Sequence, residues 1–112
     1  MHVDFVTGVP GGMPATTAAL MAGVSMLPVE VTSWSATGIG RGHLPMMAAA
    51  LSAGGHLRVG MEDNVVFRRG QVVSHNDELV ARAAELATLM QRPPLTCEET
   101  RDLLAVKDRR TR

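Results

Sequence analysis

A succession of strand, glycine-rich turn and helix is the feature that most limits how this chain can fold. It occurs twice before Gly55 and is followed by a third strand. The predicted strands cover residues 3–7, 31–36 and 57–61, and the predicted helices between them cover 15–26 and 44–53. Strands that alternate with helices form a parallel sheet with right-handed crossovers, so their C-terminal ends meet at one edge. We expect three residue pairs to gather at that edge: Gly11 and Gly12, Gly40 and Arg41, and Glu62 and Asp63.

Two further helices are predicted in the second half of the chain. Asn76 is suited to cap a helix over 77–91. Thr96, three residues before a glutamate, has the spacing of a capping box and predicts a short helix to about residue 105. Residues 65–73 carry no clear period and only a turn signal at positions 69 and 70. Because no linker or low-complexity segment interrupts the chain, we predict a single domain over residues 1–112.

Composition excludes several classes of partner. Lysine and arginine together number 11, as do aspartate and glutamate, so no net positive charge attracts nucleic acid or an anionic membrane. The basic end from Lys107 onward is expected to be a solvated tail. The lone Cys97 excludes an internal disulfide and suits a reducing compartment, and no apolar run approaches the length of a membrane span. We therefore expect a cytoplasmic protein.

The segment from His56 to Asn64 is the strongest candidate for a functional site. If it is an extended strand, His56, Arg58 and Glu62 share one face, because strand side chains alternate. We expect helices to cover this sheet, which would bury Arg58 and place Glu62 and Asp63 at the strand's C-terminal end. Buried charges are costly unless they are paired or hold a metal. An arginine beside a carboxylate favours its ionised form and fixes its geometry, which suits a base or a metal ligand.

Other candidates are weaker. The turn Gly38-x-Gly40-x-Gly42 lacks the GxGxxG spacing of a dinucleotide site, so it is either a plain tight turn or an anion-binding loop in which Arg41 contacts a phosphate. His56 and Glu62 would lie about 20 Å apart on an extended strand and could not share one ion. The four histidines are therefore expected to be structural, and the eight methionines to fill the core.

At these same residues the chain resembles the β-keto acid cleavage enzymes. The similarity runs in order through Asp4-Phe5-Val6, Gly8-Val9-Pro10-Gly11-Gly12, Trp34-Ser35, Gly38-Ile39-Gly40-Arg41, Leu44-Pro45, Gly54 through Asn64, and Asn76 with Leu79-Val80. The resemblance implies an α/β fold that is a partial (β/α)8 TIM barrel, about the last three βα units plus C-terminal helices. It also implies a divalent metal, usually zinc, and a reaction of amino acid catabolism. In that reaction a small β-keto acid and acetyl-CoA give acetoacetate and a new acyl-CoA.

The resemblance assigns roles to single residues. Glu62 corresponds to a metal-ligating glutamate, Asp63 to the general base, and Arg58 to the residue that orients this base. Gly40 and Arg41 are the weaker candidates for contact with the CoA co-substrate, from the general place of phosphate sites in barrels.

The chain departs from the family pattern in two ways. It has no His-x-His pair, which supplies metal ligands in the family, and it has three of the eight βα units of a barrel. We therefore expect it to be inactive and to hold zinc weakly unless a complementing chain or a homo-oligomer completes it. The alternatives are a non-catalytic remnant or interaction fragment, or a small anion- or CoA-binding α/β module.

Overall fold

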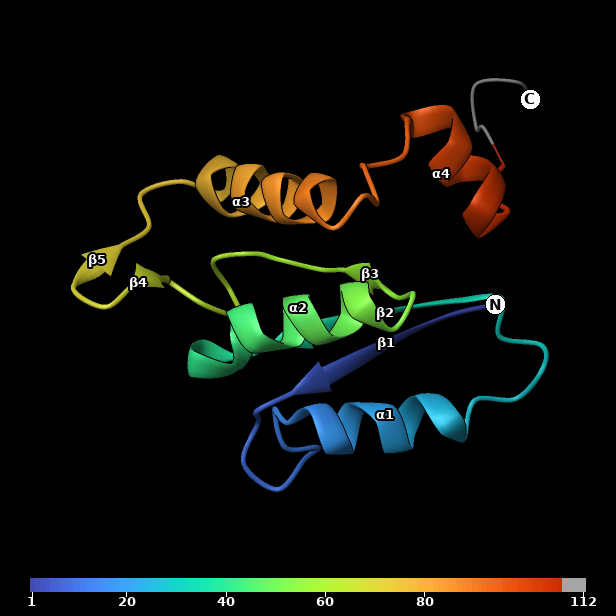
Figure 1. Ribbon diagram of the computed structural model, residues 1–112, viewed down its shortest axis with the longest axis horizontal. Helices are drawn as coiled ribbons and strands as arrows, with labels where there is room; N and C mark the ends of the chain where they lie inside the picture. Colours follow the sequence, from blue (N-terminus) through green and yellow to red (C-terminus); the bar gives the residue numbers. More distant parts are fainter. Residues whose placement is uncertain (108–112) are drawn as a thin grey trace.

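The predicted strands form one parallel sheet in which successive strands are neighbours (Figure 1). The computed structural model describes residues 1–107, so the predicted tail after Lys107 lies outside them. Strand β1 (His2–Thr7) pairs with β2 (Ser33–Gly38) along its whole length, and β2 pairs with β3 (His56–Leu57). The parallel order β1-β2-β3 confirms the predicted α/β class.

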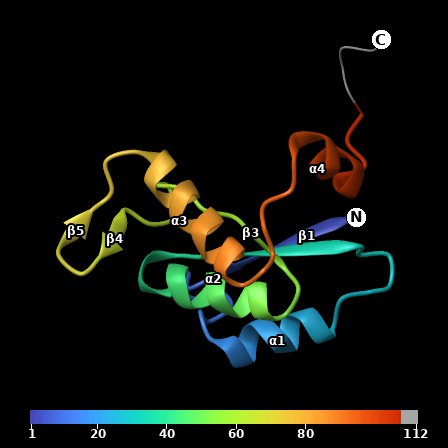
Figure 2. The same cartoon turned by 45° about the horizontal axis from the view of Figure 1, so that its top comes forward.

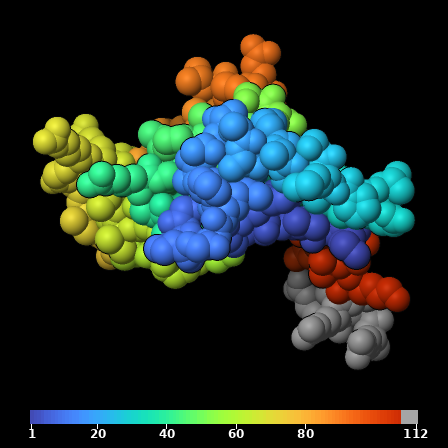
Figure 3. All heavy atoms as spheres, turned by 90° about the horizontal axis from the view of Figure 1, so that it is seen from below, coloured from blue at the N-terminus to red at the C-terminus, as the bar shows by residue number. Residues whose placement is uncertain are grey.

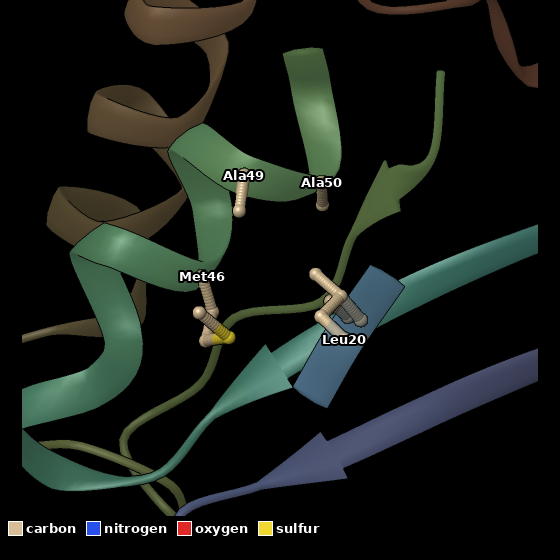
Figure 4. Close-up of a cluster of buried hydrophobic side chains, with 5 residues drawn as sticks. Leu20, Met46, Ala49 and Ala50 are labelled. Carbon is tan, nitrogen blue, oxygen red and sulfur yellow. The ribbon is translucent and has the colours of Figure 1, made fainter. Parts of the chain in front are cut away.

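Helices α1 (Thr17–Ser25) and α2 (His43–Ser52) cover one face of this sheet. Leu20 from α1 and Met46, Ala49 and Ala50 from α2 form the buried core with Ala36 of β2 (Figure 4). The partly buried residues packed against this core include Phe5, Trp34 and Leu57 from the three strands. Because strand side chains alternate, the residues between them turn to the opposite face. That opposite face is polar and carries the candidate site.

The second half of the chain packs more loosely. Strands β4 (Val66–Arg68) and β5 (Gln71–Val72) form an antiparallel hairpin that projects from the body (Figures 2 and 3). Helix α3 (Asn76–Leu89) lies beside α2, and α4 (Cys97–Leu104) follows two prolines. The Cα radius of gyration is 14.6 Å, against about 13 Å for a compact domain of this length. The hairpin and α4 both extend away from the sheet and its two helices (Figure 2).

Two predicted strands are corrected. The third strand was expected over 57–61, but β3 ends at Leu57 and a turn replaces the rest. The Arg58 amide still donates to the Ala36 carbonyl of β2 at 3.3 Å. Beyond it, the amides of Asp63 and Asn64 both donate to the Gly60 carbonyl, at 3.1 and 3.2 Å, so the backbone turns instead of continuing the strand. Strand β2 begins two residues later than the predicted 31–36, because the Val31 amide is used in a turn with Pro28.

Local signals in the second half are partly confirmed. The predicted turn at positions 69 and 70 exists, with Gly70 at φ 79°, but strands β4 and β5 flank it where no strand was predicted. The capping box of Thr96 and Glu99 starts α4 as predicted. The predicted cap Asn76 is wrong, since His75 holds the N-cap position of α3. Across the described residues, none of the helices has the length and apolar character needed to cross a bilayer.

Candidate active site

The loops that follow β2 and β3 meet at the C-terminal edge of the sheet, as predicted. The Gly40 amide donates to the Asp63 carbonyl at 3.0 Å, and the Ile39 amide donates to the Thr7 carbonyl at 2.9 Å. Arg41 lies next to this contact with an exposed side chain. The turn at Gly11 and Gly12 bends back on its own loop, where the Gly12 amide donates to Val9. The structure therefore brings Gly40 to Asp63, while the contacts of the first turn stay within that turn.

The guanidinium of Arg58 lies among three carboxylates. Its Nη1 atom is 3.2 Å from Asp4 Oδ2, and its Nη2 atom is 3.5 Å from Asp63 Oδ2 and 3.9 Å from Glu62 Oε1. The predicted pairing of Arg58 with Asp63 is confirmed. The prediction that Arg58 is buried is wrong, because 47% of its side chain is exposed on the polar face of the sheet. Helices α1 and α2 pack on the other face of the sheet, so they do not cover Arg58.

Asp63 and Glu62 lie in different surroundings although they are neighbours in the chain. The Asp63 side chain is 11% exposed, and its Oδ2 atom is buried without a hydrogen-bond donor among the described residues. The Glu62 side chain is 62% exposed and folds over Gly60, where an added Cβ would clash with the Glu62 carboxylate. Asp63 is thus held next to Arg58 and shielded from bulk water, whereas Glu62 faces outward.

Asp4, on β1, is held by two hydroxyls of the neighbouring strand β2. Its Oδ1 atom accepts a hydrogen bond from Ser35 Oγ at 2.6 Å, and its Oδ2 atom accepts one from Thr37 Oγ1 at 2.8 Å. Ser35 and Thr37 are buried, and the Thr7 hydroxyl in turn donates to the Thr37 carbonyl at 3.0 Å. Each oxygen of the Asp4 carboxylate therefore accepts a hydrogen bond from β2, in addition to the hydrogen bond that Arg58 donates.

His43 fixes the loop that carries Gly40. Its Nδ1 atom lies 2.7 Å from the Gly40 carbonyl, and its Nε2 atom contacts the Arg82 guanidinium. A carbonyl only accepts and a guanidinium only donates, so the neutral ring is protonated on Nδ1. Burial and the nearby Arg82 charge lower the pKa of His43, partly opposed by the hydrogen bond to Gly40. This histidine has a structural role, as predicted: it holds the Gly40 loop at the C-terminal edge of the sheet, where the candidate site lies.

Comparison with known proteins decides the family. The family model described as beta-keto acid cleavage enzyme matches residues 1–106. This chain belongs to the beta-keto acid cleavage enzyme family. It is 41% identical over 106 residues to the 3-keto-5-aminohexanoate cleavage enzyme of Acetoanaerobium sticklandii, covering 95% of this chain and 38% of that relative.

Two other relatives in the family carry transferase names. The 3-oxoadipate:acetyl-CoA acetyltransferase of Cupriavidus necator is 34% identical, with 95% of this chain and 38% of the relative covered. The 3-dehydrocarnitine:acetyl-CoA trimethylamine transferase of Rhizobium meliloti is 36% identical, with 96% and 35% covered. The chain therefore spans little more than a third of the length of these curated relatives.

The metal implied by the family resemblance does not find a full set of ligands here. Within residues 1–107, no group of three or more His, Cys, Asp or Glu side chains could hold a metal ion. Zinc in proteins takes about three or four such ligands. Glu62 is exposed and stands beside Arg58, whose positive charge would oppose a cation. The described residues thus do not fit a complete zinc site, and Glu62 could provide one ligand at most.

Sequence reasoning missed the polar face of β1 and β2 in this family member. Asp4, Ser35 and Thr37 form the support of Arg58, and none was a candidate. A signal was present, because Ser33, Ser35 and Thr37 alternate with the apolar residues of β2. The alternation of small polar residues on a predicted buried strand indicates an inward polar face. The alternation alone does not identify Asp4 as the partner of the Ser35 and Thr37 hydroxyls, because that contact depends on the parallel register of β1 and β2.

His2 and His56 extend this polar face toward the N-terminal ends of the strands. The two nitrogens of His2 lie 2.7 Å from Ser33 Oγ and 3.0 Å from Ser35 Oγ, and the rings of His2 and His56 are 6.2 Å apart. Burial, followed by the charges of Arg92 and His2, lowers the pKa of His56. Through these contacts His2 and His56 belong to the support of the sheet.

Proposed function

We propose that this chain provides the acid–base part of an enzyme that joins a small β-keto acid to acetyl-CoA, with acetoacetate and a new acyl-CoA as products. Family membership and the acetyl-CoA named for two relatives support the reaction class. The observation that carries the proposal is the Arg58 guanidinium between Asp4 and the shielded carboxylate of Asp63. A carboxylate of this kind can take a proton from a substrate carbon next to a carbonyl group.

Each residue has a separate role in this proposal. Asp63 is the general base, because its Oδ2 atom is buried and receives no hydrogen bond from the described residues. Arg58 sets the direction of the Asp63 carboxylate through the contact at 3.5 Å. The Gly40 amide holds the backbone of Asp63. The exposed Arg41 beside Gly40 is the candidate for contact with the phosphates of acetyl-CoA.

The complete protein is proposed to be a (β/α)8 barrel in the cytoplasm. Three successive parallel strands with α1 and α2 on one face match part of such a barrel, where all helices lie outside. Glu62 is proposed as a single ligand of a divalent metal, with zinc the first candidate. The further ligands would have to come from outside the described residues, on a complementing chain or a second copy.

A hybrid enzyme tests the proposed reaction. This chain replaces the matched segment of the Acetoanaerobium sticklandii relative, and acyl-CoA formation from 3-keto-5-aminohexanoate and acetyl-CoA is measured. We expect an active hybrid in which Asp63→Asn lowers kcat by about 10²- to 10⁴-fold, the usual contribution of a general base. Glu85→Gln, an exposed carboxylate on α3, is the matched control and should keep full activity. Full activity of the Asp63→Asn hybrid would exclude this residue as the base.

The isolated chain provides a second test. We expect no turnover and only weak zinc binding by calorimetry, because the described residues do not complete a metal site. Tight stoichiometric zinc together with turnover would contradict this expectation. Phosphate or CoA binding without turnover, abolished by Arg41→Ala, would instead favour an anion-binding module.

A further inference from the structure

We propose that Asp4 is a positioning residue for the active site: it anchors one arm of Arg58 so that the other arm stays directed at Asp63. This inference rests on the proposed function, since it assigns to Arg58 the task of orienting the base. Asp4 lies 54 positions from Arg58 in the chain and on the far strand of the sheet, two strands away from β3. Nothing in the local sequence around Arg58 would connect the two residues.

The contacts of Arg58 divide between its two terminal nitrogens. Nη1 donates a hydrogen bond to Asp4 Oδ2 at 3.2 Å, which makes Asp4 the nearest of the three carboxylates. Nη2 faces Asp63 at 3.5 Å and Glu62 at 3.9 Å. A planar guanidinium held at one nitrogen has a fixed direction for the other. The Asp4 contact therefore determines where the arm facing Asp63 points.

Asp4 is itself well fixed, as an anchor must be. Ser35 is its register partner on β2, and Thr37 lies two residues further on the same face. Both hydroxyls donate to the Asp4 carboxylate from buried positions, and only 22% of the Asp4 side chain is exposed. These donors hold both oxygens as acceptors. The pairing of β1 with β2 already has its own backbone hydrogen bonds, so the strands do not need Arg58 to stay together.

Asp4 would keep Arg58 in place while Asp63 changes its charge during the proposed reaction. When Asp63 takes up a proton it becomes neutral, and its attraction for Arg58 decreases. The Asp4 carboxylate takes no part in this transfer, and its hydrogen bond keeps Nη1 in place. Arg58 then stays directed at Asp63 for the next cycle. Without Asp4, the half-exposed guanidinium would be free to turn toward solvent or toward Glu62.

Side-chain NMR of the full 112-residue chain, labelled with ¹⁵N, tests this proposal. The signal followed is the rotation of the Arg58 guanidinium, which a hydrogen-bonded anchor slows. We expect slow rotation in the unmodified chain. In Asp4→Asn we expect rotation roughly tenfold faster or more, the rate change that loss of a charge-assisted hydrogen bond predicts. Glu85→Gln is the matched control for removal of one carboxylate and should leave the signal unchanged.

A second pair of variants separates positioning from general stability. Thr37→Val removes the hydroxyl that fixes Asp4 and should speed Arg58 rotation, whereas Thr37→Ser keeps the hydroxyl and should restore slow rotation. Fast rotation in the unmodified chain, or unchanged rotation in Asp4→Asn and in Thr37→Val, would overturn the proposal. If Asp4→Asn fails to fold, the Thr37 pair decides alone. The readout needs no substrate, so an inactive hybrid enzyme would refute the proposed function without affecting this result.

Discussion

Arg92 is predicted to be a main support of the turn that leads into the candidate site. Its Nη1 atom donates to the Leu51 carbonyl at 2.9 Å and to the Gly55 carbonyl at 2.7 Å, and Nη2 donates to the Gly54 carbonyl at 3.2 Å. These carbonyls belong to the end of α2 and to the turn before β3. The last carbonyls of a helix lack partners within the helix, and a cation there also suits the helix dipole.

The cost of Arg92→Ala follows from these three contacts. A hydrogen bond to a charged group contributes roughly 1.5–3 kcal/mol when sheltered. Two of the three are partly buried and the third is exposed, where water can replace it. Release of the ordered arginine side chain returns up to about 2 kcal/mol of entropy. We therefore expect a loss of about 2–3 kcal/mol in the free energy of unfolding. Arg92→Lys should lose roughly half as much, because a compact ammonium cannot reach three carbonyls together.

Urea unfolding measures this loss. Trp34, the single tryptophan, packs against Gly55 and reports on the same region by fluorescence. The slope of the free energy of unfolding against urea concentration should be the same in all variants, so that a shift in the unfolding midpoint reports a change in stability. Arg69→Ala, an exposed arginine at the hairpin turn, is the control and should change stability by less than about 0.5 kcal/mol. A similarly small change for Arg92→Ala would refute the assignment of these contacts.

Three further outcomes are expected. Gly55→Ala should destabilise the chain by about 1–3 kcal/mol in urea unfolding, because its Cβ would lie 2.5 Å from the Trp34 ring. Hydrogen bonds from the amides of His75 and Ser74 lower the pKa of Glu78 below its usual 4.5. Its stabilising effect is therefore present above that value and lost at lower pH, so the stability difference between the unmodified chain and Glu78→Gln should shrink as pH falls through 4.5. Burial lowers the pKa of His43 below its usual 6.5, so stability should decrease as pH falls below 6.5, and less so in His43→Asn.

The sequence alone was sufficient for the order of the three parallel strands and the α-helices around them, and for the family. Local signals such as the capping box of Thr96 and the glycines after each strand act over a few residues, so they can be interpreted without the fold. The alternation of strands with helices predicted the parallel sheet from short distances along the chain. The pairing of Arg58 with Asp63 was implied by the family resemblance and not by their spacing.

Tertiary structure decided what depends on distant strands. The sequence could not show that β3 ends at Leu57, because the end of this strand is set by the turn in which the Asp63 and Asn64 amides donate to the Gly60 carbonyl. Nor could it show that Arg58 is half exposed, since exposure depends on which face the helices cover. The anchor at Asp4 exists only because the register of β1 against β2 places that carboxylate beside Ser35 and Thr37. Contacts between residues far apart in sequence are properties of the register, and the register is fixed only when the sheet has formed.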